Sequence, residues 1–91
     1  MINIYSDGRD CENKLQFIVN MLAGDDILIL VGDGIMNAVV PKCLSDAACR
    51  IYVLENDLTA RGFNKTKIGE IITIEQMVDL IAYDLKSPIS W

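Results

Sequence analysis

The pattern of apolar and polar positions along the 91-residue chain predicts strands that alternate with helices. Ile27–Val31 is an unbroken apolar run that is rich in β-branched residues, a pattern typical of a strand covered on both faces in a parallel sheet. Further short strands are expected at residues 1–5, at 50–54 and around 71–72. The stretches between these strands carry helical signals.

The segments between the first three predicted strands are expected to form short helices, which glycine or proline interrupts. Apolar residues recur at helical intervals after residue 14, and Gly24 provides a stop. Two helical pieces are expected at residues 35–40 and 44–48, separated by Pro41. Tight turns and short helices therefore connect the early strands.

The later connections carry clearer terminal signals. Residues 55–62 predict one helical turn with an Asn or Asp cap and a glycine exit. Thr73 and Gln76 have capping-box spacing, and apolar residues then recur at helical intervals as far as residue 85. Four alternations of strand and helix predict one domain over residues 1–91, a small three-layer α/β sandwich with a mostly parallel four-stranded sheet.

Composition and charge restrict the chemistry. Eight basic and thirteen acidic residues give a net charge of −5, and there is no histidine. Catalysis and zinc binding that need imidazole are therefore excluded, and direct binding of nucleic acid is not expected. The apolar fraction of 52% is high for so small a chain, so another chain is expected to cover part of the surface. No predicted segment is long enough to cross a membrane.

The three cysteine thiols are the candidate sulfur nucleophiles of this chain. Their odd number and their spacing fit a reducing compartment, which predicts a cytoplasmic protein. Cys11 is the candidate for a persulfide, because it lies near a helix start and two residues from Arg9. A small buried hydrophobe is the alternative role for Cys11, and also for Cys43 and Cys49.

Acidic residues follow the first three predicted strands. A hard cation such as Mg²⁺ could bind carboxylates gathered there, whereas capping of turns and helices would explain them without a ligand. Gly32–Gly34 superficially resembles a phosphate-binding turn but fits a plain tight turn better, since Asp33 would repel an anion. The acidic residues are Asp7, Asp10, Asp33, Glu55 and Asp57.

Three pieces of the chain resemble the TusB/DsrH family of sulfur-relay subunits. They are Asp33-Gly34-Ile35 after the apolar strand, the strand 51–54 running into residues 56–63, and the terminal Trp91. The most specific part is the Asp-Leu-x-Ala-Arg-Gly pattern of Asp57–Gly62. The resemblance implies a DsrE-like fold with flavodoxin-like topology. It also implies a heterohexamer with TusC-like and TusD-like sister subunits that passes persulfide sulfur to a TusE-like carrier, toward 2-thiolation of the wobble uridine of tRNA.

The resemblance implies an accessory role, without a cofactor, for this chain. The family's main reactive cysteine belongs to the TusD-like sister, and the cysteine that some DsrH-type members carry in the first helix aligns near Ile18. Arg61 is then either an interface anchor or a solvated cation at a helix end. Trp91 packs either on its own domain or in a subunit interface, and Gly62 permits the helix exit.

Other functions stay open at this point. The chain could serve intracellular sulfur oxidation as a DsrH-type subunit, or carry a persulfide on Cys11 in its own right. A small anion- or metal-binding module at the acidic strand ends is a further alternative, and self-association could replace the heterohexamer.

Overall fold

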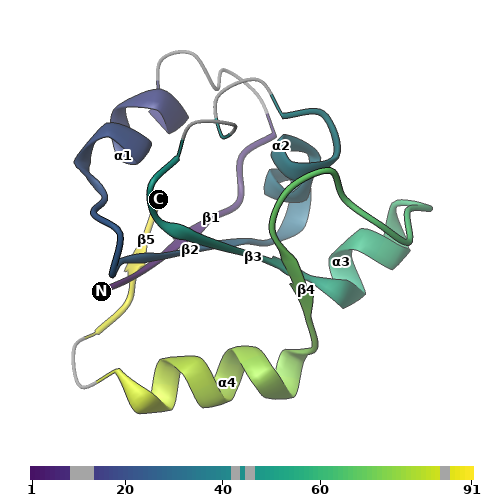
Figure 1. Cartoon of the computed structure of the whole chain (residues 1–91). Helices are drawn as coiled ribbons and strands as arrows, with labels where there is room; N and C mark the ends of the chain where they lie inside the picture. Colours follow the sequence, from purple (N-terminus) through teal and green to yellow (C-terminus); the bar gives the residue numbers. More distant parts are fainter. Residues whose placement is uncertain (9–13, 42–43, 45–46, 85–86) are drawn as a thin grey trace.

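The computed structural model describes residues 1–8, 14–41, 44, 47–84 and 87–91. It contains one sheet of five parallel strands in the order β4-β3-β2-β1-β5, with helices between successive strands (Figure 1). The strands are Ile2–Tyr5 (β1), Ile27–Leu30 (β2), Arg50–Leu54 (β3), Glu70–Ile72 (β4) and Ile89–Ser90 (β5). The helices are Gln16–Met21 (α1), the 3₁₀ turn Gly32–Ile35 (η2), Met36–Val39 (α2), Glu55–Ala60 (α3) and Ile74–Tyr83 (α4).

The predicted fold class and the four predicted strands are confirmed. The structure also contains β5. The sequence pattern did not indicate this strand, because the two residues after Pro88 are too few to show an alternation of apolar and polar positions. Pairing of Asn3 and Ile4 with residues 89 and 90 creates this strand. The strand order also differs from the flavodoxin order of 2-1-3-4-5, since β1 here lies between β2 and β5.

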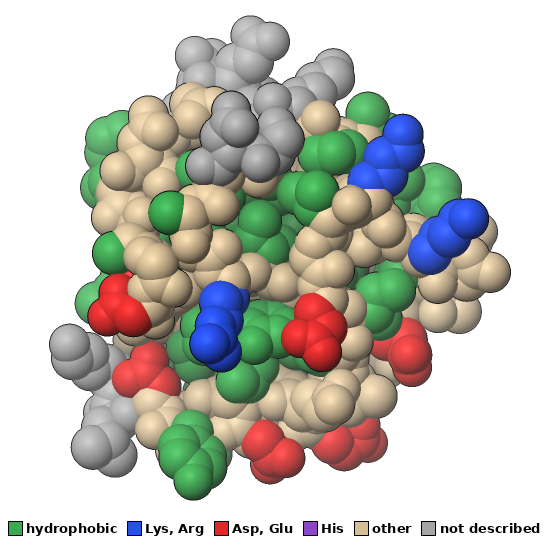
Figure 2. Space-filling view, viewed as in Figure 1, with side chains coloured by type: hydrophobic (Ala, Val, Ile, Leu, Met, Phe, Trp, Pro, Cys, Tyr) green, Lys and Arg blue, Asp and Glu red, His purple; other side chains and the backbone are tan. Residues whose placement is uncertain are grey.

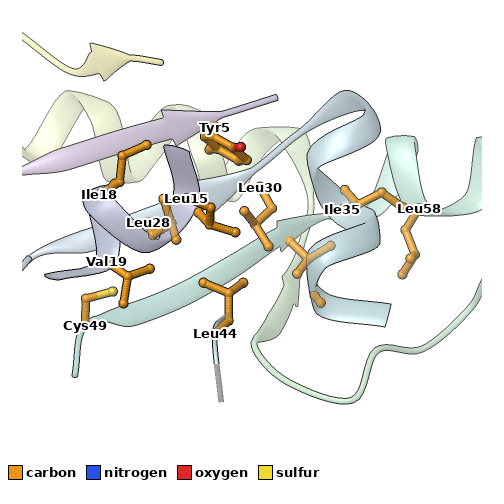
Figure 3. Close-up of a cluster of buried hydrophobic side chains, with 12 residues drawn as sticks. Tyr5, Leu15, Ile18, Val19, Leu28, Leu30, Ile35, Leu44, Cys49 and Leu58 are labelled. Carbon is orange, nitrogen blue, oxygen red and sulfur yellow. The ribbon is translucent and has the colours of Figure 1, made fainter. Parts of the chain in front are cut away.

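The middle strand β2 is buried on both faces, as its sequence predicted. Leu28, Ile29 and Leu30 are fully buried, and β2 pairs with β1 on one side and β3 on the other. One face of the sheet packs against α1, α2 and α3 around a single cluster of apolar side chains (Figure 3). The labelled members of this core are Tyr5, Leu15, Ile18, Val19, Leu28, Leu30, Ile35, Leu44, Cys49 and Leu58.

Of the helices in the described part of the chain, only α4 covers the other face of the sheet (Figure 1). Connections between parallel strands are right-handed, so three successive steps from β1 to β4 place their helices on one face. The connection from β4 to β5 crosses the sheet in the direction opposite to these three steps, from one edge to the other, and therefore places α4 on the other face. A single helix, about 10 Å in diameter, covers this face of a sheet whose outer strands lie about 19 Å apart.

Helix α4 begins as predicted but packs loosely. Thr73 Oγ1 accepts a hydrogen bond from the Gln76 backbone N–H at 3.2 Å, and Gln76 Oε1 accepts one from the Thr73 N–H at 2.8 Å, which completes the capping box. None of the residues of α4 is buried. The predicted helical piece at 44–48 falls partly outside the described residues, and Leu44, Ala47 and Ala48 are not helical. No helix in the described part of the chain could span a bilayer.

The C-terminal residue packs on its own domain. The Trp91 backbone N–H donates to the Ile4 carbonyl at 2.9 Å, and the indole Nε1–H donates to Asn3 Oδ1 at 3.1 Å. Asn3 is 1% exposed, so this contact satisfies a buried amide within an otherwise apolar strand. The indole also packs against the core while staying partly exposed.

We expect Trp91→Ala to lower the free energy of unfolding by about 2 kcal/mol, because it removes a partly buried ring and leaves Asn3 without this partner. Tyr83→Ala is the matched control: its ring is 91% exposed, so the change should be within about 0.5 kcal/mol. Urea denaturation followed by circular dichroism measures both. Equal effects of the two variants would contradict the packing role of Trp91.

Candidate functional site

The carboxyl ends of β1, β2 and β3 meet at one edge of the sheet, where parallel α/β sheets bind ligands. The loops that follow these strands carry most of the residues predicted from the family motifs. An open hollow of about 490 Å³ lies between the first two loops. It is lined by Ser6, Asp7, Gly8, Asp33 and Met36.

The Gly32–Gly34 turn is explained by backbone geometry. Gly32 has a φ of +53°, in the left-handed region that favours glycine. A Cβ on Gly34 would overlap the Tyr5 carbonyl oxygen, and one on Gly8 would lie 2.6 Å from the Asp33 carbonyl oxygen. The two loops therefore approach each other too closely for side chains, which confirms a tight turn.

Asp57 ties α3 to this turn. Its Oδ2 accepts a hydrogen bond of 2.7 Å from the Gly32 N–H, across 25 residues of sequence. The predicted Asn or Asp cap is wrong, since Leu54 occupies the N-cap of α3 and makes no side-chain cap. Because an internal carboxylate already binds the Gly32 N–H, that amide is not available to a phosphate.

Arg61, at the C-terminal end of α3, also links α3 to the Gly32–Gly34 turn. Its Nη2 and Nε donate to Asp33 Oδ1 at 2.8 and 3.1 Å, and its Nη1 donates to the Asp57 carbonyl at 3.1 Å. Gly62 follows with a φ of +83°, as the predicted helix exit requires. The structure thus brings together Asp33, Gly34, Asp57 and Arg61, which we call the loop clamp.

Asn37 links the loop after β1 to the loop clamp, and this role was not predicted. Its Nδ2 donates to the Asp7 carbonyl at 3.0 Å and to the Gly34 carbonyl at 3.1 Å, and the side chain is 8% exposed. The only signal in the sequence is a single amide among the apolar residues 35–40. A buried amide needs hydrogen-bond partners, but the sequence does not say which carbonyls supply them.

The acidic edge forms no metal site in the part of the chain that the structure describes. No group of three or more carboxylates or thiols there could hold a metal ion. Asp57 is turned toward the Gly32 N–H and Asp33 toward Arg61. Of the other acidic candidates, Glu55 is exposed on α3, and Asp10 lies outside the described residues.

The one described cysteine is a poor nucleophile. Cys49 is 8% exposed and packs in the core near Val19 (Figure 3). Burial, with a smaller contribution from the Asp26 carboxylate, raises the pKa of the Cys49 thiol above its usual value. Little thiolate is then present at neutral pH. Cys11 and Cys43 lie outside the described residues, so the persulfide prediction for Cys11 stays a prediction.

Replacing Asp57 should cost more stability than replacing Asp33. Asp57→Ala leaves the Gly32 N–H without its partly buried charged acceptor, and we expect a loss of about 1.5–2 kcal/mol. Asp33→Ala removes an ion pair whose carboxylate is 75% exposed, so about 0.5 kcal/mol is expected. Urea denaturation of both variants gives the comparison. A larger loss for Asp33→Ala would contradict this assignment.

Comparison with a solved structure supports the fold. The chain is similar to the protein Tm0979 from Thermotoga maritima, whose solution NMR structure matches with a TM-score of 0.70. The match covers 94% of this chain and 97% of that chain at 17% sequence identity, so it bears on the fold alone. No curated protein matches the chain.

The family assignment comes from the sequence profile. The profile of the family "DsrH like protein" matches residues 10–87, which include all four residues of the loop clamp. The chain therefore belongs to the DsrH-like family of sulfur-relay subunits that its motifs indicated.

Proposed function

We propose that the chain is the TusB-like subunit of a cytoplasmic sulfur-relay complex that serves 2-thiolation of the wobble uridine of tRNA. In this proposal it assembles with TusC-like and TusD-like sister subunits, and sulfur leaves through a TusE-like carrier. The observation that carries the proposal is the family match over residues 10–87.

The chemistry of such a relay needs a reactive thiol but no metal. A thiolate attacks the outer sulfur of a persulfide, a new S–S bond forms, and the donor leaves as a thiolate, so the transfer involves no net oxidation or reduction. The acceptor thiol must be ionised and accessible. Cys49 meets neither condition, so it is not the thiol that such a relay needs.

The loop clamp supports a structural role for this chain. Its charged groups bind one another and the backbone, so at this edge they hold the ends of β2 and β3 in a fixed arrangement. Such an edge can present a rigid surface to a neighbouring subunit. The high apolar fraction of the chain agrees with burial of part of its surface in an assembly.

Co-expression tests the proposal directly. The tagged chain should retain both TusC-like and TusD-like chains through affinity and size-exclusion steps, and native mass spectrometry should give equal numbers of the three subunits. The control is the same resin loaded with the two untagged sister chains alone. A chain that elutes as a monomer and retains neither sister would contradict the proposal.

A further inference from the structure

A groove lies between α4 and the β3–β4 side of the sheet, on the face opposite the main core. Its volume is about 310 Å³. Tyr52 and Ile72 of the sheet and Leu80 of α4 supply its apolar lining. The polar and mixed side chains that line it are Glu70, Gln76, Asp79 and Tyr83.

Several apolar or aromatic side chains of α4 are exposed to solvent. Tyr83, which lines the groove, is 91% exposed, and Val78 and Ile74 on α4 are 58% and 43% exposed. Figure 2 shows hydrophobic side chains in the space between α4 and the sheet, with a basic side chain beside them and acidic side chains along α4. An exposed tyrosine beside an apolar hollow is a frequent anchor of protein interfaces.

Among the described residues that line the groove, the charged ones are acidic. Glu70 and Asp79 line it, Glu75 lies on the same helix, and neither Lys nor Arg is among the lining residues. Arg50 lies on the same face of the sheet but does not line the groove. A second copy of this chain would bring the same acidic groove and another net charge of −5, whereas a basic partner would be attracted.

We propose that this groove is the docking site for a segment of a partner protein that presents a large apolar side chain flanked by Lys or Arg. The apolar side chain fills the space between Tyr52, Ile72 and Leu80, and the flanking cations meet Glu70 and Asp79. The inference goes beyond the sulfur-relay proposal and does not depend on it, because it rests on the shape and charge of this groove.

Selection from a phage library of random 12-residue peptides tests the chemistry of the occupant. The immobilised chain should enrich peptides with Lys or Arg next to Leu, Phe or Trp. A synthetic copy of the most enriched peptide is then titrated against the chain by fluorescence anisotropy. Enrichment of acidic or uncharged peptides, or no enrichment, overturns the proposal.

Charge reversal tests the location. The double variant Glu70→Lys/Asp79→Lys should weaken binding of the selected peptide by about tenfold, as two favourable charge contacts become repulsive. Asp25→Lys/Glu55→Lys is the matched control, since it makes the same change in net charge at exposed positions that do not line the groove. All four positions are exposed, so both proteins should fold. Equal weakening by both variants overturns the proposal.

An apolar substitution separates the groove from general charge attraction. Tyr83→Ser should weaken peptide binding by about fivefold, and Phe17→Ser, which alters a 59% exposed ring on α1, should leave it within twofold. Equal effects of Tyr83→Ser and Phe17→Ser overturn the proposal. Sedimentation of the unliganded chain completes the test: a homodimer that Tyr83→Ser dissociates assigns the groove to a second copy and also overturns it.

Discussion

Right-handed connections between parallel strands divide the helices of this chain unequally between the two faces of its sheet. Three connections place α1, α2 and α3 on one face, and the return from β4 to β5 places only α4 on the other. The first face consequently holds the packed core, whereas no residue of α4 is buried. The high apolar fraction of the chain is thus explained in part by a sheet face that one short helix covers incompletely.

The same topology brings the family motifs together. Residues 33–34 and 57–61 are separate in sequence but follow the neighbouring strands β2 and β3, so their side chains meet at one edge. The charged motif residues bind each other and the backbone, and this explains the motif without a bound ligand. The consequence is a rigid edge of the sheet at the ends of β2 and β3.

The sequence predicted features that depend on local chemistry and missed those that depend on distant partners. The buried strand β2 and the capping box of α4 follow from the apolar run and from the Thr73–Gln76 spacing. Strand β5 exists only because it pairs with β1, and Asn37 and Asp57 each bind a backbone group 25 to 30 residues away. The helical period correctly predicted α4, although Ile74 and Val78 of the predicted apolar stripe are exposed. The period does not show that the sheet face beneath is too wide for one helix.

Intact mass spectrometry tests most directly whether a sister subunit carries the persulfide sulfur while this chain has a structural role. The reconstituted complex is incubated with a cysteine desulfurase and cysteine, and the mass of each subunit is measured before and after reduction. We predict a reducible gain of about 32 Da, one sulfur atom, on the TusD-like subunit and none on this chain. A gain on this chain that Cys11→Ser abolishes would contradict the claim.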